Sequence, residues 1–582
     1  MKDGCLAAFL KVPPSQHIVI TTFFLASGRN RSLKIVFIPH VRRGINAYSG
    51  TAMFIQPLVP AGHSLVLSFL LAASPIIVTL FVMGILRRPA WQATLGGLIV
   101  GLLVATTIWG LPAKLAVASI SNGVVFSLLP VMWIALSALF LFNVAVQNGR
   151  FDAFRDWIIQ HVPNDRRIML VVLGFCFSAA LEGVAGFGTP VAITSALLIM
   201  LGFPALDALT YVLIFNSAPV AFGGLGIPVT VLGSITGLPA DVLGATIGRQ
   251  LTPFALLIPF YVMALYGGWR SVRQTWPVLL VAGGSFALTL LIISGAGLYS
   301  LSNVLSSSVA LVATIGFLRF WKPASDPQYA IDLTHLNNQQ ASAVPVPRWQ
   351  GWIPWITVIA VVIAWDALHI AKIGTLPIHW PGLDNAVFIS LYKTPYAAVW
   401  KFEPLGTGTA ILVATILTAL FTRTKLQQFG AAARTTLKQG WLAVVTVALT
   451  IGLAFLMNYS GMTYTLGYAV SSAGMVFPLV SVFLGWIAVF LTGSDTSGNA
   501  LFGNLQVAAA HQLSLDPVLF ASANSSGGVM GKMISPQNIT TGVSVTSLKG
   551  QEGTVLARTF KHSLFLTFCI GLVVVFQQFV LR

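Results

Sequence analysis

The fold is decided by the stretch LEGVAGFGTP at residues 181–190, which interrupts an apolar segment with glycines and one acidic side chain. A matching interruption, TGSDTSGN at residues 492–499, also carries a single acid. Irregular backbone is tolerated at membrane depth only where protein or a water-filled cavity satisfies it, and paired breaks in two halves are typical of a transport site. The sequence therefore predicts a secondary transporter. Second polar breaks follow the first, with equivalent residues 308 positions apart: Asn216 with Asn524, and Pro228 with Pro536.

The composition requires a lipid environment. Of the 582 residues, 56% are hydrophobic and 8% are charged, which is about a third of the charged fraction of a soluble domain. Apolar runs such as residues 64–86, 277–293 and 564–581 are long enough, with their flanks, to cross about 30 Å of hydrocarbon as helices. We expect an all-α polytopic membrane protein with about 12–14 transmembrane helices, in two inverted repeats with broken or re-entrant helices.

The net charge of +17 indicates how the chain is oriented in the membrane, because the basic residues gather in alternate loops. By the positive-inside rule these loops are cytoplasmic. We expect a first transmembrane half at residues 53–320, a cytoplasmic linker at 321–350 and a second half at 351–582. Residues 1–52 form a basic extension that is expected to be disordered or a misassigned start. The amphipathic stretch at residues 150–158 is expected to lie along the membrane interface.

Two acidic side chains in the breaks are candidates for proton coupling. Burying a charge at membrane depth costs several kcal/mol unless it is neutralised or solvated. Glu182 follows an apolar run and precedes the glycines, so we expect it near mid-membrane with few partners, where it could carry a proton. A helix-capping carboxylate or a structural ion pair are the alternatives. Asp495 lies among hydroxyl side chains and either couples to protons or caps the half-helix that follows.

The glycines and small polar residues of the breaks are candidate ligands of a small anion. Gly186 and Gly188 let backbone amides approach a ligand closely. A half-helix that starts near Thr189 and Pro190 would present free N–H groups and the positive end of its dipole. The second break, at residues 494–498, would supply another such end. Two positive ends suit one carboxylate with a nearby hydroxyl, although the same glycines could instead serve only close helix packing.

Two basic residues complete the candidate site. Lys532 lies just past the second polar break, and it either meets a substrate carboxylate, snorkels or pairs with Asp495. Arg249, which precedes the apolar run at 251–266, is expected to be interfacial or to form an ion pair between the repeats. The candidate substrate-binding residues are thus Gly186, Gly188, Thr189, Asn216, Ser494, Thr496, Ser497, Asn499, Asn524 and Lys532.

The sequence contains no motif for ATP hydrolysis. The run GVMGK at residues 528–532 lacks the spacing of a phosphate-binding loop, so transport must draw on an ion gradient. The three cysteines have neither disulfide nor metal spacing. Because common catalytic motifs are also missing, we expect no metal, no cofactor and no enzyme activity.

Four stretches closely resemble the bacterial L-lactate permease family. They are LEGVAGFGTPVAIT at 181–194, NSAPVAFG at 216–223, LTGSDTSGNALF at 491–502 and GVMGKMISPQ at 528–537. The likeness extends over about residues 57–582 and leaves residues 1–52 without a counterpart. The resemblance implies import of lactate, and often glycolate, together with protons across the plasma membrane. It also implies the fold of ion transporters with two inverted repeats.

We therefore expect a multi-pass protein of the bacterial plasma (inner) membrane. It would import L-lactate, and glycolate or related 2-hydroxy monocarboxylates, by proton symport, with the lipid bilayer but no nucleic acid as a further partner. Sodium coupling at the Ser, Thr and Asn clusters is the alternative within the same class, because their oxygens suit that ion. A passive channel and an intramembrane enzyme that uses Glu182 or Asp495 are alternatives from other classes.

Overall fold

The computed structural model describes residues 53–84, 86, 88–184, 188–324, 326–331, 346–544, 546–548 and 551–581. The expectation for residues 1–52 therefore lies outside the described residues. The all-α polytopic class is confirmed: within the described ranges, nine helices are long and apolar enough to cross a membrane, or up to ten if one bent pair counts as a span.

This number is below the 12–14 spans expected because joined helices count once and short ones are left out. α11 alone has 56 residues, and a break at Gly267 and Gly268 divides it into two segments that could each cross. Three shorter apolar helices, at 190–200, 302–317 and 407–421, add further membrane-depth segments.

The first half contains β1 and the helices up to α12. The elements are β1 (Phe54–Ile55), α1 (Leu65–Gly84), α2 (Ala90–Thr107), α3 (Ala113–Phe126), η2 (Ser127–Met132), α4 (Trp133–Gln147), α5 (Arg150–His161), α6 (Arg166–Met169), η3 (Leu170–Phe177), α7 (Ser178–Val184), α8 (Thr189–Met200), α9 (Ala205–Phe215), η4 (Val220–Phe222), α10 (Gly223–Thr236), α11 (Ala240–Gly295) and α12 (Ser302–Phe317).

The linker and second half follow. Their elements are η5 (Pro327–Tyr329), η6 (Arg348–Trp352), α14 (Ile353–Ala367), η7 (Ile370–Lys372), β2 (Leu376–His379), β3 (Val387–Ile389), β4 (Thr394–Pro395), β5 (Val399–Phe402), α15 (Thr407–Phe421), α16 (Leu426–Ser460), α17 (Met462–Val470), η8 (Ser471–Val476), α18 (Phe477–Thr492), α19 (Asp495–Gln512), α20 (Pro517–Lys532), α21 (Pro536–Ser544) and α22 (Glu552–Phe579).

The described strands are short and lie between α14 and α15, apart from β1. β2 and β5 form an antiparallel pair with Leu376 opposite Phe402. β3 pairs in parallel with β1 and antiparallel with β4. The strands therefore tie the start of the described chain to the loop between two helices of the second half.

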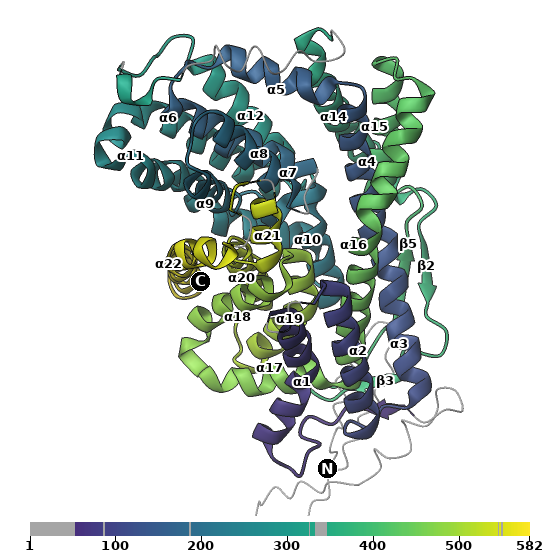
Figure 1. Cartoon of the computed structure of the whole chain (residues 1–582). Coiled ribbons are helices and arrows are strands. Elements are labelled where there is room, and N and C mark those ends of the chain that lie inside the picture. Colours follow the sequence, from purple (N-terminus) through teal and green to yellow (C-terminus); the bar gives the residue numbers. More distant parts are fainter. Residues whose placement is uncertain are drawn as a thin grey trace, which may run out of the picture. The chain divides into compact units, whose positions relative to one another are not determined.

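Helices from the two halves of the sequence pack together. α2, α3 and α4 contact the long α16, and α4 also contacts α15 (Figure 1). The interrupted helices form a second set, in which α10 contacts α19 and α11 contacts α20. The breaks of both halves therefore meet inside one set of helices.

Glycines at left-handed backbone positions make the breaks. Gly224, Leu225 and Gly226 follow one another with φ values of 53°, 57° and 79°, so regular helix in α10 begins only at Ile227. A Cβ atom on Gly226 would lie 2.9 Å from the Tyr299 ring. In the second half, Gly493 ends α18 with φ 73°. Glycine is favoured at Gly226 and Gly493 because it adopts positive φ at little cost.

Other glycines serve close packing instead. A Cβ atom on Gly485 would collide with the backbone of Asn524, and one on Gly527 or Gly531 with the backbone of Val482 or Trp486. α18 and α20 can therefore approach backbone to backbone only because these positions lack side chains. These packing glycines lie outside the two breaks at residues 181–190 and 492–499.

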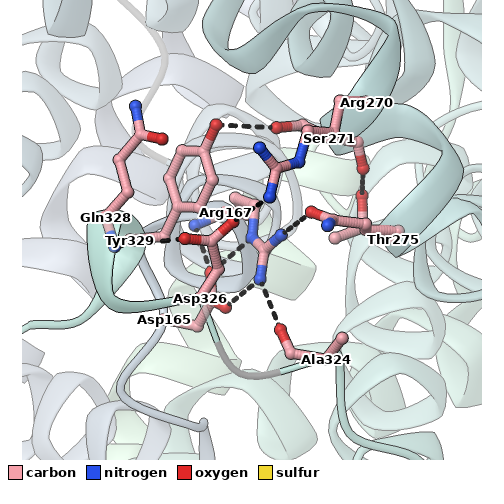
Figure 2. A network of polar contacts seen from close by, with 10 residues as sticks. Asp165, Arg167, Arg270, Ser271, Thr275, Ala324, Asp326, Gln328 and Tyr329 are labelled. Atoms are coloured by element: carbon pink, nitrogen blue, oxygen red, sulfur yellow. Dashed lines mark hydrogen bonds and ion pairs between the residues drawn. The ribbon is translucent and has the colours of Figure 1, made fainter.

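A buried arginine fastens the start of the linker to the first half (Figure 2). Arg167 is fully buried, and its guanidinium donates to Asp165 at 2.6 Å, to the carbonyl of Ala324 at 3.1 Å and to Gln274. Its Cζ lies 4.5 Å from the centre of the Tyr329 ring. The guanidinium is thus held on several sides, and the chain after α12 is anchored against α6 and α11.

Removing Arg167 should therefore destabilise the fold. We expect Arg167→Met to lower the free energy of unfolding in detergent by about 3 kcal/mol, because it removes a buried guanidinium and leaves the mostly buried Asp165 carboxylate, 13% exposed, without its cation. Arg270→Met is the matched control: Arg270 also pairs with an acid, Asp326, but its side chain is 75% exposed. Its cost should stay within about 1 kcal/mol. Equal losses in the two variants, measured by denaturant unfolding, would contradict the role given to Arg167.

Candidate functional site

A small cavity lies where the breaks of both halves meet. Its volume is about 50 Å³, far below the several hundred Å³ of pockets for drug-sized ligands, so it suits waters or a small ligand. The first half supplies Glu182 from α7 and residues of η4 and α10, and the second half supplies the start of α19, the end of α20 and the start of α21. The lining residues are Glu182, Val220, Gly223, Gly224, Ile227, Pro228, Gly493, Ser494, Asp495, Thr496, Lys532 and Gln537.

Glu182 forms a buried ion pair across the two halves. Its Oε1 accepts from Lys532 Nζ at 2.7 Å, and its Oε2 accepts from Asn216 Nδ2 at 3.0 Å. Residues Glu182 and Lys532 are 2% and 7% exposed, so the two charges neutralise each other away from solvent. A Cβ atom on Gly223 would lie 2.9 Å from Oε1, which explains a glycine there. The sequence predicted few partners for Glu182 and considered Asp495 as the partner of Lys532; the structure instead joins Glu182 with Lys532.

Asp495 has partners on only one of its two carboxylate oxygens. Oδ2 accepts from Ser525 Oγ at 2.6 Å and from Asn499 Nδ2 at 3.3 Å. Oδ1 is buried and has no hydrogen-bond partner among the described residues. The carboxyl therefore keeps one buried oxygen available, and no basic side chain of the described part pairs with it.

Asparagines connect this carboxyl to both halves. Asn499 Nδ2 also donates to the carbonyl of Pro228 at 3.2 Å, across to the first half. Asn524 Nδ2 donates to Asn499 Oδ1 at 2.9 Å. Both asparagines are fully buried. They satisfy polar groups at the breaks that would otherwise be costly in a low-dielectric interior.

Two helix N-termini border the cavity. Ile227 and Pro228 begin the regular part of α10, and Ser494 caps α19, accepting from the backbone N–H of Ser497 at 3.4 Å. The first turn of a helix has free N–H groups and the positive end of its dipole. Together with Lys532, these ends make the cavity suited to an anion.

The first of these ends differs from the one predicted. Gly188 does not line the cavity but packs against Asn538 and Thr541 of α21, and α8 starts there. Gly186 and the side chain of Thr189 lie outside the described residues. The left-handed residues 224–226 make the regular helix of α10 begin at Ile227, beside the cavity. The first helix N-terminus at the cavity therefore belongs to α10 and not to α8.

The remaining predicted residues fall into two groups. Ser494 and Thr496 line the cavity, whereas Asn216, Ser497, Asn499 and Asn524 are buried behind it. Arg249 is exposed on α11 and donates to the hydroxyl of Thr246 at 3.0 Å, without an ion pair to any described residue.

Sequence reasoning did not single out several residues of the site, among them the polar or tightly packed Gly223, Ser525 and Gln537. Gly223 and Gln537 lie inside the quoted motifs, and Ser525 directly follows Asn524 of the second polar break, so the breaks themselves were a signal. The contacts of each residue depend on how the breaks of the first half pack against those of the second half. The spacing of residues along the chain does not contain that information.

A larger cavity of about 620 Å³ lies along the same helix, α10. Thr230 and Ser234, two and six residues after Pro228, line it together with Asn458 and Tyr459 of α16 and with Lys401. α10 therefore borders both cavities, with its N-terminal end at the small one.

A sequence model of the family described as L-lactate permease matches residues 68–581 of this chain. The chain belongs to the L-lactate permease family. The resemblance seen in the four motifs is thus confirmed. The chain is 38% identical over 546 residues to the L-lactate permease of Salmonella typhimurium, covering 90% of this chain and 98% of that protein.

Relatives in this family carry more than one substrate name. The glycolate permease GlcA of Escherichia coli K12 is also 38% identical, over 552 residues, with 90% of this chain and 98% of that protein covered. Among solved structures, the chain is similar to the YdaH transporter of Alcanivorax borkumensis, with 14% identity, a TM-score of 0.41, and 79% of this chain and 87% of that chain covered. The permease family and the apolar helices indicate a multi-pass membrane transporter rather than an enzyme.

The ion pair predicts a specific pattern of stability in this permease-family protein. Lys532→Met leaves a buried Glu182 without its cation and should cost about 3–5 kcal/mol of unfolding free energy at mildly alkaline pH. Adding Glu182→Gln should recover most of that loss, because the neutral amide keeps the size of the side chain and needs no cation. Denaturant unfolding of the two single variants and the double variant measures the coupling. Strict additivity of the two substitutions would show that the pair does not form.

Proposed function

We propose that the protein is a secondary active transporter that imports L-lactate, and glycolate or related 2-hydroxy monocarboxylates, by proton symport across the bacterial plasma (inner) membrane. The observation that carries this proposal is the cavity that joins two buried carboxyls, one lysine and two helix N-termini from both halves. The names of the relatives, L-lactate permease and glycolate permease, support the substrate class.

The substrate carboxylate would bind to Lys532 and the helix ends. A carboxylate that enters the cavity competes with Glu182 for the ammonium group, which is 2.7 Å from Oε1 in the structure. The free N–H groups at the start of α10 and α19 add positive potential. The 2-hydroxyl group would then find hydrogen-bond partners in Thr496 and Gln537, which line the same cavity.

Charge balance provides the coupling to protons. When the substrate carboxylate replaces Glu182 as the ion-pair partner of Lys532, Glu182 becomes a buried carboxylate without a cation. Such a buried, unpaired charge is strongly unfavourable. A proton on Glu182, or on the free Oδ1 of Asp495, restores the net charge of the cavity. One proton for each monocarboxylate would keep that charge constant through the transport cycle. Both carboxyls are therefore proposed as proton carriers.

Movement of α10 would provide alternating access. This helix borders the small cavity with Ile227 and Pro228 and the larger one with Thr230 and Ser234. Its left-handed run at 224–226 would serve as the hinge, because the backbone leaves right-handed helical geometry there. A shift of α10 against α16 and α19 would connect or separate the two cavities.

Sodium coupling is the second candidate, and one observation favours it. Asp495 has one buried oxygen without a hydrogen-bond partner among the described residues, and its other oxygen accepts from the hydroxyl of Ser525; carboxylate and hydroxyl oxygens suit a hard cation. The two candidates differ in which ion gradient drives accumulation.

Uptake into proteoliposomes separates the candidates. With proton symport, an imposed pH gradient, acidic outside, should drive L-lactate above its external concentration in nominally sodium-free buffer. A protonophore should abolish the accumulation because it removes the gradient. Accumulation that requires sodium and ignores the protonophore would support the sodium alternative. Equilibration without accumulation under either gradient would contradict active transport.

Neutral variants of the two carboxyls test their role. Asp495→Asn and Glu182→Gln should lose gradient-driven accumulation yet retain some exchange of internal for external lactate, because exchange does not need net proton movement. Asp241→Asn, an exposed acid at the start of α11, is the matched control and should transport normally. If a variant still accumulates substrate fully, the residue that it replaces does not carry the coupling proton.

A further inference from the structure

A third cavity, distinct from the two described above, lies between α12 and α14. It has a volume of about 510 Å³ and is lined mainly by apolar side chains. α5 contributes one side chain, α12 and its end contribute one wall, and η6 with α14 contribute the other. The lining residues are Trp157, Ser308, Val312, Ile315, Gly316, Arg319, Trp352, Trp355, Ile356 and Ile359. We call this pocket the α12–α14 groove.

The groove opens to the hydrocarbon of the membrane. Val312 and Ile356, on its two walls, are 54% and 60% exposed. Both belong to apolar helices, so exposure at these positions means contact with lipid chains rather than water. From Ser308 to Gly316 the wall extends over about 12 Å of helix rise. An extended acyl chain fits a groove of this length and lining.

One end of the groove is aromatic and charged. Arg319 lies just after the C-terminal end of α12, and Trp352 lies just before the N-terminus of α14. These are the two ends of the linker between the halves. Trp157 of α5 packs edge-on against Trp352, with ring centres 5.1 Å apart. Tryptophan at the membrane–water interface places its ring in the apolar region and its N–H towards headgroups. The indole N–H groups of both residues have no hydrogen-bond partner among the described residues.

Arg319 is the feature that selects a ligand. It is exposed and forms no ion pair with any described residue. The described chain after it continues to Ala324 and Tyr329, which contact Arg167 beside α6 and α11 (Figure 2). A guanidinium at the headgroup level of an apolar groove pairs well with a phosphate.

From this arrangement we infer that the α12–α14 groove binds one anionic glycerophospholipid. An acyl chain lies between α12 and α14, and the phosphate lies at Arg319 with the indoles of Trp157 and Trp352 beside it. The lipid bridges the end of the first half and the start of the second. This site is separate from the transport cavity and goes beyond the proposed transport function.

Lipid retention by the purified full chain tests the headgroup. Delipidated protein is mixed with phosphatidylglycerol or phosphatidylcholine of identical acyl chains, and bound lipids are counted by native mass spectrometry. We expect one phosphatidylglycerol to be retained in preference to phosphatidylcholine. Arg319→Gln should reduce this preference by about fivefold, whereas Lys438→Gln, at an exposed lysine of α16 outside the groove, should leave it unchanged. An unchanged preference in Arg319→Gln would overturn the inference.

Filling the groove tests the acyl chain. A Cβ atom on Gly316 meets nothing within 4 Å, so Gly316→Leu adds bulk to the groove without a clash inside the fold. Gly430→Leu, in α16, is matched because its Cβ also meets nothing within 4 Å. Only Gly316→Leu should lose the retained phosphatidylglycerol, with the unfolding midpoint preserved in both. Retention of phosphatidylglycerol by Gly316→Leu would overturn the lipid site. A change in the dimer content of Gly316→Leu without loss of lipid would also overturn it, because the groove would then bind a second copy of the chain.

Discussion

The ion pair of Glu182 with Lys532 is the contact on which the rest of the site depends. It joins residues 350 positions apart, and both side chains are almost fully buried. Either charge alone in this environment would cost several kcal/mol, so the fold is stable only if α7 and α20 bring the two together. Once they meet, the breaks beside them face the same cavity.

The interrupted backbone imposes a second constraint. Each break leaves N–H and C=O groups without helical partners, and in a lipid-like interior these must be satisfied by protein or water. The Asn499 side chain bonds to the carbonyl of Pro228, and Asn524 bonds to Asn499 in turn. The Asn499 amide also donates to the Asp495 carboxyl, so the features that stabilise the fold and those that build the site are largely the same.

Much of the organisation was predictable from local patterns. The 308-residue spacing between Asn216 and Asn524 indicated equivalent breaks, and Glu182, Asp495 and Lys532 were recognised because ionisable residues are rare at membrane depth. Individual pairings were not predictable. The sequence offered Asp495, and not Glu182, as the ion-pair partner of Lys532, and it placed the first helix end near Thr189 and Pro190 rather than at α10. Arg249 has the same chemistry as a site residue but lies on an exposed face of α11.

The sequence by itself determined the class of molecule and the position of its breaks. The length of the apolar runs, the glycine clusters and the acidic residues within apolar segments are all local features that can be read from one stretch of sequence at a time. It also indicated the family, through the four motifs, and the family model that matches residues 68–581 confirms it. Only the tertiary structure decided which charges pair, which helix ends face the cavity and where an apolar groove with one arginine opens to lipid. Those outcomes depend on helices far apart in the chain packing side by side, and no pattern within a single segment contains that geometry.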